Sequence, residues 1–371
     1  MIELALLLIV SIVCYILYGL LKNVRGCIKY CESIPSSNNS QAISIIKPSK
    51  GITDFTRSNF SSWVNQKYDS PIEVIFAFDE GDPGITLVKE LNLPNVKIVS
   101  HPILEGFSGK MSALYHGVTL ASHELLVFSD GDTLASYNTC SQIITQINKT
   151  AKIVTCPARY TVAQNIWGRI YASLWNLVEF GVVGPEVVKN GDKVFGTTFT
   201  LSKQTLSLLG GLSIFKNYIA EDMAIGQKAK QKGVSIVLGP VIEAPVGVIT
   251  FPELLAKLSR AALYTKTMRR FRENWRFIAI YSYLFVIISP AFFLGNLLLV
   301  LVFCLAVARL VFESYMWYTI TQEKRVMYGC FLGDPIFLLT YIVTSITRKM
   351  KWSGRVYRVF SNGRMERRAD D

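Results

Sequence analysis

The sequence predicts a Rossmann-like α/β domain with a mainly parallel sheet, flanked by an N-terminal transmembrane anchor and C-terminal membrane helices. Two observations lead to this prediction. The 371-residue chain is 50% hydrophobic, and its long uncharged stretches lie near its two ends. Between them, short runs of β-branched and aromatic residues alternate with stretches long enough for helices, which is the pattern of strands joined by helical crossovers.

The first uncharged stretch, Leu4 to Leu21, is long enough to cross a hydrocarbon core about 30 Å thick. It is longer than the apolar region of a secretory signal, and the cations Lys22, Arg25 and Lys29 follow it rather than precede it. We therefore favour an uncleaved anchor over residues 1–28, with a cleaved signal as the alternative. By the positive-inside rule, these cations place the following domain in the cytosol.

Residues 29–42 contain Pro35 and a Ser/Asn cluster, which is typical of a linker. We expect the α/β domain over residues 43–250. Its strands are expected at Ile43 to Ile46, Val74 to Phe78, Val96 to Val99, Leu125 to Phe128 and Ile153 to Val154.

Acidic residues follow two of these strands, and ligands of such sheets bind outside the carboxyl ends of the strands. Asp130 and Asp132, separated only by Gly131, can hold Mg²⁺ or Mn²⁺ together with a substrate's phosphate or ribose. Asp79 closes an earlier strand, and its carboxylate can hydrogen-bond a nucleotide base or ribose at the same edge. Acidic turns also cap strands without binding anything, so each motif taken alone has this simpler reading.

Two further polar residues lie at expected helix starts. Lys110 opens a helix whose backbone amides and dipole would favour a nearby phosphate. Asp222 precedes a segment of helical character that runs to Lys232, and it either caps the helix or acts as a general base.

Residues 251–276 read as an amphipathic, basic helix at the membrane surface, whose cations face lipid headgroups. Arg260 can instead reach a departing diphosphate, where a fixed positive charge stabilises the leaving group.

Membrane helices are expected over residues 277–347. The uncharged stretch Phe277 to Ala308 is too long for one perpendicular span, so we favour a hairpin that returns at Arg309 over one long tilted helix. The stretch Met327 to Ile346 contains Asp334 and is expected to be re-entrant or interfacial, because a single crossing would export the basic tail at 348–371.

The formal net charge of +12 does not indicate a nucleic-acid partner, because the cations gather at the membrane borders and in the tail without a nucleic-acid motif. Anionic lipid and a diphosphate explain them better. The seven cysteines form no disulfide pattern, and with only three histidines in the chain we expect no zinc site.

In this order, the motifs resemble those of the ceramide glucosyltransferases and their bacterial lipid-glycosylating relatives, which are inverting glycosyltransferases of the GT-A fold. The resemblance extends from the anchor almost to the end of the chain. The matching motifs are Ser44-Ile45-Ile46-Lys47-Pro48-Ser49-Lys50-Gly51, Asp79 with Asp82-Pro83, Lys110, Asp130, Gly210-Gly211-Leu212, Tyr218-Ile219-Ala220-Glu221-Asp222 and Trp352-Ser353-Gly354-Arg355-Val356-Tyr357-Arg358.

The resemblance implies transfer of a hexose, most simply glucose, from a UDP-sugar to a ceramide-like lipid at the cytosolic leaflet. It implies that Asp79 binds the uridine, that Asp130 and Asp132 hold the metal and diphosphate, and that Asp222 is the catalytic base. It also implies an integral protein of the Golgi or ER membrane in a eukaryote, or of the inner membrane in a bacterium.

The chain departs from the family pattern at three places. The family's Arg/Gln-x-x-Arg-Trp motif reads Arg260 to Tyr264 here, with Leu263 in place of the second arginine. Tyr264 would stack on donor or acceptor, and Lys266 or Arg269 would have to supply the lost charge. Asp130-Gly131-Asp132 replaces an Asp-Ser-Gly triplet, and Gly184 stands where the animal enzymes carry a histidine near the acceptor. Alternatives are therefore a hopanoid or acylglycerol acceptor, or a catalytically silent relative that binds UDP-sugar or lipid.

Overall fold

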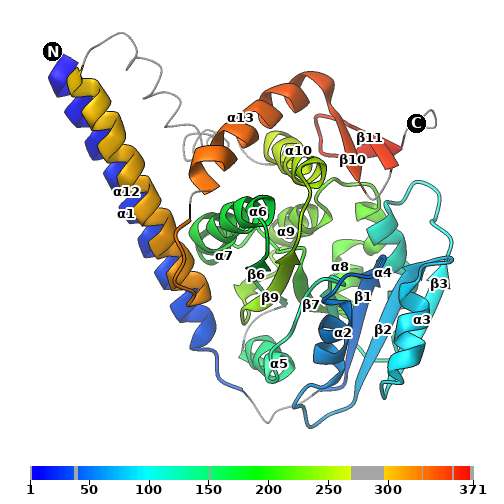
Figure 1. Ribbon diagram of the computed structural model, residues 1–371. Helices are drawn as coiled ribbons and strands as arrows, with labels where there is room; N and C mark the ends of the chain where they lie inside the picture. Colours follow the sequence, from blue (N-terminus) through cyan, green and yellow to red (C-terminus); the bar gives the residue numbers. More distant parts are fainter. Residues whose placement is uncertain are drawn as a thin grey trace.

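The computed structural model describes residues 2–36, 41–149, 152–268, 296–327, 329–352 and 355–367. Its centre is a seven-stranded sheet in the order β3-β2-β1-β4-β7-β5-β8 (Figure 1). The strands are β1 (Ile43–Ser49), β2 (Ile72–Asp79), β3 (Val96–His101), β4 (Leu125–Ser129), β5 (Ile153–Thr155), β7 (Thr198–Ser202) and β8 (Ile236–Leu238). All five strands expected from the sequence are present, and the sheet is mainly parallel as predicted.

One strand of the sheet runs against the others. β7 pairs antiparallel with both β4 and β5, so the sheet is mixed. A second, two-stranded parallel sheet is formed by β6 (Ala158–Ala163) and β9 (Ile242–Gly247). Neither feature was expected, because local sequence patterns indicate a strand but not the direction in which it enters the sheet.

Alternate residues of β2 explain why both faces of the sheet are covered. Phe76 and Phe78 pack against Phe60 of α2 (Thr56–Val64) on one face. Ile75 points to the other face, where it packs in the same cluster as Met111 of α4 (Gly109–Leu120). The remaining helices of this domain are α3 (Gly84–Leu91), α5 (Thr139–Lys149), α6 (Ile166–Asn176), the π-helix η1 (Leu177–Val183), α7 (Gly184–Asn190), α8 (Lys203–Leu209), the 3-10 helix η2 (Leu212–Phe215) and α9 (Glu221–Gln231).

The N-terminal helix α1 (Ile2–Glu32) is longer than the expected anchor and ends inside the expected linker. Its last turns belong to the protein core, since Cys27, Ile28 and Cys31 are buried there. The part Ser11–Glu32 is long and apolar enough to cross a membrane, a test that a signal sequence or a core helix also passes.

The helix α12 (Asn296–Thr321) lies alongside α1 (Figure 1). It does not end at Arg309, where we expected the hairpin to return, but continues as one helix to Thr321. Arg309 is only 2% exposed and forms an ion pair with buried Asp334 at 3.6 Å, so its charge is stabilised within the protein rather than by solvent. The first part of the expected hairpin, 277–295, lies outside the described residues.

The helices α10 (Phe251–Met268) and α13 (Gly329–Thr347) pack against each other over the α/β domain (Figure 1). The expected interfacial helix at 251–276 is therefore anchored on the domain as far as Met268, with Leu254, Leu258 and Leu263 in the core. Residues 269–276 lie outside the described part of the chain.

The expected basic tail is a folded element. Three strands, β10 (Lys349–Trp352), β11 (Arg355–Val359) and β12 (Met365–Arg367), form an antiparallel sheet, which we call the C-terminal sheet. Apolar side chains interspersed among its cations are buried in the main core, and they are Met350, Tyr357, Val359 and Met365. This buried face was missed from the sequence because the segment is rich in cations, which is typical of a solvent-exposed tail.

Candidate active site

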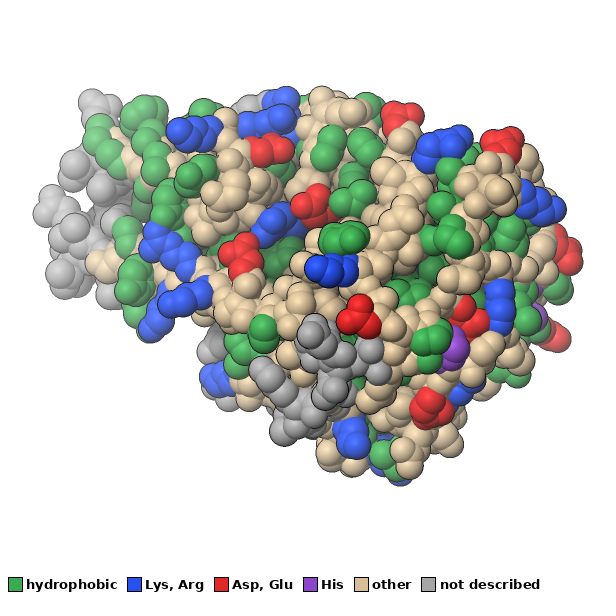
Figure 2. All heavy atoms as spheres, turned by 90° about the horizontal axis from the view of Figure 1, so that it is seen from below, with side chains coloured by type: hydrophobic (Ala, Val, Ile, Leu, Met, Phe, Trp, Pro, Cys, Tyr) green, Lys and Arg blue, Asp and Glu red, His purple; other side chains and the backbone are tan. Residues whose placement is uncertain are grey.

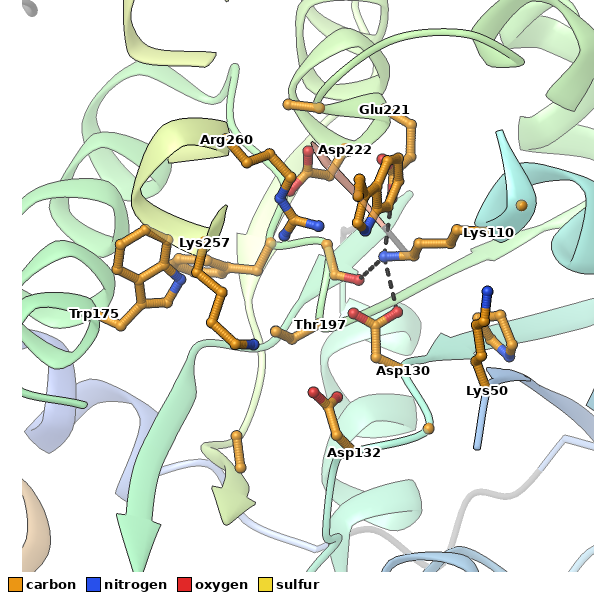
Figure 3. A pocket seen from close by; sticks show the side chains of 18 of the residues that line it. Lys50, Lys110, Asp130, Asp132, Trp175, Thr197, Glu221, Asp222, Lys257 and Arg260 are labelled. Carbon is orange, nitrogen blue, oxygen red and sulfur yellow. Dashed lines mark hydrogen bonds and ion pairs between the residues drawn. The ribbon is translucent and has the colours of Figure 1, made fainter. Parts of the chain in front are cut away.

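A cavity of about 430 Å³ opens at the carboxyl ends of β1, β2 and β4 (Figure 3). The seven residues to which the sequence analysis assigned catalysis or binding all line it. They are Asp79, Lys110, Asp130, Asp132, Asp222, Arg260 and Tyr264. Residues from separate regions of the chain therefore meet at one edge of the sheet.

Lys110 lies at the centre of this edge. Its ammonium contacts Asp130 at 2.8 Å and Glu221 at 2.9 Å, and it donates a hydrogen bond to the carbonyl of Gly196 at 2.9 Å. Ser108 caps the helix that carries it by accepting from Met111 N. Burial acts to lower the pKa of Lys110, but the two carboxylates outweigh it and raise the pKa above its usual range. The lysine thus joins the acidic turn after β4 to the start of α9.

The two carboxylates that contact Lys110 differ in the direction of their pKa shifts. Burial raises the pKa of Asp130 to about 6, against the opposing pull of Lys110. For Glu221, burial acts in the same direction, but the neighbouring Lys110 prevails and holds the pKa below its usual range. Glu221 is consequently the more firmly ionised of the two.

A buried lysine hydrogen-bonds to the acidic turn that contains Asp130 and Asp132. Lys47 of β1 donates to the carbonyl of Asp130 at 2.7 Å and to the hydroxyl of Thr133 at 3.1 Å. Burial lowers the pKa of Lys47 to about 7. A Cβ on Gly131 would lie 2.6 Å from the Ser49 hydroxyl oxygen, so glycine between the two aspartates allows β1 and the turn to approach closely. These contacts fix the direction in which both carboxylates leave the turn.

The donor atoms fit a divalent cation that binds together with a phosphorylated ligand. Asp130 and Asp132 both point into the cavity (Figure 3). Within the described part of the chain, no group of three acidic, histidine or cysteine side chains could hold a metal by itself. Mg²⁺ and Mn²⁺ sites with one or two carboxylates are commonly completed by phosphate oxygens and water.

Asp222 faces the cavity from the first turn of α9. One of its oxygens accepts a hydrogen bond from Met223 N at 2.8 Å. A Cβ on Gly196 would lie 2.6 Å from the other oxygen, so glycine at that position leaves room for it. Burial, assisted by the charge of Glu221, raises the pKa of Asp222 to about 7. A carboxylate with such a pKa can accept a proton near neutral pH.

Helix α10 brings two cations and an aromatic ring to the cavity. Arg260 lies with its guanidinium 5.0 Å from the ring centre of Trp352, and Lys257 lies 4.8 Å from that of Tyr171. Figure 3 shows Lys257 extending from α10 into the cavity, which Thr197 and Trp175 also line. Both cations and Tyr264 line the cavity.

Leu263, which stands in place of the family's second arginine, does not line this cavity. Leu263 is 1% exposed and packs in the core. Lys266, one proposed substitute, lies outside the cavity lining and donates to Ser345 O. Arg269, the other, lies outside the described residues. Lys257 is the α10 lysine that lines the cavity.

The C-terminal sheet forms part of the cavity wall. Asp79 forms ion pairs with Lys50 at 3.7 Å and with Arg355 at 3.6 Å. Trp352, Arg355 and Tyr357 line the cavity, although they are far from Asp79 in sequence.

Comparison with known proteins identifies the family. Residues 4–365 match the model of Glycosyl transferase family 21. The chain belongs to glycosyltransferase family 21. This match confirms the family resemblance inferred from the sequence motifs, and it makes the cavity the candidate active site of a glycosyltransferase.

One solved structure supports the fold of this glycosyltransferase, and a second aligns less well. The mannosyltransferase PcManGT from Pyrobaculum calidifontis, in complex with GDP-Man and Mn²⁺, aligns with a TM-score of 0.57 and 14% identity, covering 92% of this chain and 99% of that one. TarS 1-349 from S. aureus, in complex with UDP-GlcNAc, aligns with a TM-score of 0.40 and 12% identity, covering 89% and 100%. The first alignment confirms a GT-A-like α/β fold.

Several charged residues that line or support the glycosyltransferase site had no site role assigned from the sequence. They include Lys47, Glu221, Lys257 and Arg355. All but Lys257 lie inside motifs that carried the family resemblance, without a role assigned to them. Lys257 precedes Arg260 by three residues on the same helix, a spacing that places both on one face, so this signal was present.

Proposed function

We propose that this enzyme transfers a hexose, most simply glucose, from a UDP-sugar to the hydroxyl of a lipid such as ceramide at the cytosolic leaflet, with inversion at the anomeric carbon. One observation carries the proposal. Asp222, with a pKa of about 7, lines the same cavity as the paired carboxylates of Asp130 and Asp132. A proton acceptor and a metal-binding pair within one cavity are the two groups that such a transfer requires.

The donor's parts match the chemistry of the cavity. Asp79 would accept hydrogen bonds from the uridine, while Asp130 and Asp132 would hold the diphosphate through Mn²⁺ or Mg²⁺. That cation, when bound, neutralises charge on the departing diphosphate. Arg260, supported by Lys257, would add fixed positive charge at the same group, and Tyr264 offers a ring on which donor or acceptor can stack.

The reaction proceeds in one displacement. The acceptor hydroxyl oxygen forms a bond to the anomeric carbon as the bond from that carbon to the β-phosphate oxygen breaks. The hydroxyl proton passes to Asp222, and UDP leaves with the electron pair. Attack opposite the leaving group makes a β-glycosidic bond from an α-linked donor. In this scheme Lys110 keeps Asp130 and Glu221 in place without exchanging a proton.

Exposed apolar surface supports a lipid acceptor at a membrane. On the part of the molecule formed by α1 and α12, hydrophobic side chains lie among Lys and Arg (Figure 2). Tyr15, Tyr18, Phe303 and Val311 are among the exposed ones. Apolar residues of α6 and of the π-helix η1 also line the cavity, and η1 packs against α1. Hopanoid and acylglycerol acceptors would suit the same surface.

The test uses the full-length protein purified in detergent, with UDP-glucose, Mn²⁺ and a pool of ceramide, hopanoid and acylglycerol acceptors. We expect one glycolipid product by mass spectrometry, and its loss in Asp222→Asn while UDP binding persists. Transfer to a non-lipid acceptor in a parallel reaction, with none to these lipids, would refute the acceptor class. UDP binding without any transfer, across a screen of sugar donors, would instead favour the catalytically silent relative that the absence of the family's second arginine suggested.

A further inference from the structure

The C-terminal sheet reaches the loop that leads directly into the proposed base. This loop, residues 217–220, immediately precedes Glu221 and Asp222 at the start of α9. Ala220 precedes the helix without a side-chain cap, so the loop does not hold the helix start by capping. Its position must come from what packs against it.

Backbone hydrogen bonds join the loop to the C-terminal sheet as if it were a further strand. Ile219 N donates to Gly363 O at 2.9 Å, and Met365 N donates to Asn217 O at 2.8 Å. Tyr218 and Arg364 form an antiparallel bridge between these two bonds. The loop therefore continues the sheet beyond β12.

A single side chain reinforces this pairing. Arg364 donates through Nη1 to the side-chain oxygen of Asn217 at 2.9 Å. Its guanidinium also lies 4.8 Å from the ring centre of Tyr218. Arg364 thus contacts two consecutive loop residues, by a hydrogen bond and by a cation–π contact.

The turn that precedes β12 and contains Arg364 packs tightly against the core. Gly363 has φ +76°, and a Cβ there would collide with the Met268 side chain at the end of α10. Ile219 and Met365 are each 3% exposed in the main core cluster. The turn cannot move away from α10 without uncovering these residues.

The same sheet contacts the cavity at its other end. Trp352 of β10 stacks on Arg260, and Arg355 of β11 forms an ion pair with Asp79. The C-terminal sheet thereby contacts the loop before Asp222, helix α10 and Asp79.

We propose that the C-terminal sheet positions the catalytic base, with Arg364 as the positioning residue acting through Asn217 and Tyr218. The proposal rests on the assignment of Asp222 as the base. Its consequence is kinetic: Arg364 does not line the cavity, so its loss should misplace Asp222 while the donor contacts of Asp130 and Asp132 persist.

The test compares Arg364→Ala with Arg367→Ala in the full-length enzyme. Arg367 is an exposed arginine of β12, so the control removes the same charge from the same sheet without touching the loop. We expect Arg364→Ala to lower kcat about tenfold, the effect of one charge-assisted hydrogen bond, with KM for the UDP-sugar changed by less than about twofold. Arg364→Lys should recover part of the loss, because its ammonium still donates to Asn217.

A double-variant comparison separates positioning from general destabilisation. If Arg364 acts through Asn217, Asn217→Ala should lower kcat similarly, and combining it with Arg364→Ala should add little further loss. Additive losses, unchanged kcat in Arg364→Ala, or an equal fall in Arg367→Ala would overturn the proposal. So would a fall in UDP affinity as large as the fall in kcat.

A measurement without turnover keeps this proposal distinct from the proposed function. Amide hydrogen exchange followed by mass spectrometry should show faster exchange over 217–223 in Arg364→Ala and not in Arg367→Ala. Absence of any sugar transfer would refute the proposed function, while unaltered exchange over this segment would refute the anchoring of the loop.

Discussion

Replacing Asp222 by asparagine should make the protein more stable while it stops turnover. Burial raises the pKa of Asp222 from its ordinary 3.8 to about 7, so the folded state holds this proton more tightly than the unfolded state. Stability therefore falls as pH rises between these two values, and the full penalty is present above pH 7. Asparagine has a similar shape and no charge, and it avoids the penalty.

The size of the gain follows from the two pKa values. The difference between 3.8 and about 7 sets a ceiling of roughly 4 kcal/mol, at about 1.4 kcal/mol for each pH unit. Asp222 is only partly buried by surface area, so solvent screening reduces this to about 2 kcal/mol. In a protein of 371 residues, that corresponds to a rise in Tm of roughly 2–3 °C.

Thermal unfolding of detergent-solubilised protein at pH 8, 6 and 4 measures this gain. We expect Asp222→Asn to exceed the wild type at pH 8, by less at pH 6 and not at pH 4. Asp54→Asn is the matched control, because Asp54 is exposed and outside the cavity lining, and it should leave Tm and turnover unchanged. Equal or lower stability of Asp222→Asn at pH 8, or the same gain at all three pH values, would refute the reasoning.

Three further variants probe the rest of the cavity. Asp132→Ala should abolish the Mn²⁺-dependent part of UDP binding in calorimetry, whereas Asp222→Asn should keep it; equal losses would contradict the division of roles. Lys110→Met leaves the buried carboxylate of Glu221 and the partly buried carboxylate of Asp130 without their cation and should lower the free energy of unfolding by about 3 kcal/mol, measured by denaturant titration; an unchanged midpoint would show that the carboxylates find other partners. Lys257→Ala should raise KM for the UDP-sugar about tenfold with Lys266→Ala as control, and equal effects of the two would refute a role specific to the cavity.

The sequence alone was sufficient for the features that depend on neighbouring residues. Buried strands are recognisable as short β-branched runs, and parallel strands deliver the residues that follow them to one edge. Asp79, Asp130 and Asp132 could therefore be assigned to a common site from their positions after these strands. A helix start next to Asp222 was predictable because the helical character of the segment up to Lys232 is also a local pattern, although α9 begins one residue earlier, at Glu221.

Tertiary packing decided which of these groups are paired and which are buried. Lys110 was expected beside a phosphate but contacts Asp130 and Glu221, because α4 and α9 approach β4 from distant parts of the chain. Leu263 faces the core while Lys257 faces the cavity, since the rotation of α10 is set by what its apolar side packs against.

The C-terminal sheet shows most clearly what local sequence patterns could not predict. Its sequence is rich in cations and is typical of a solvated tail, yet Tyr357 and Met365 are buried and Arg364 holds the loop before Asp222. The hydrogen bonds that create this arrangement join residues more than a hundred positions apart, so no local pattern records them. Local preference determines where a strand can form, whereas its partner is chosen by long-range packing, and that choice brings the end of the chain to the proposed catalytic base.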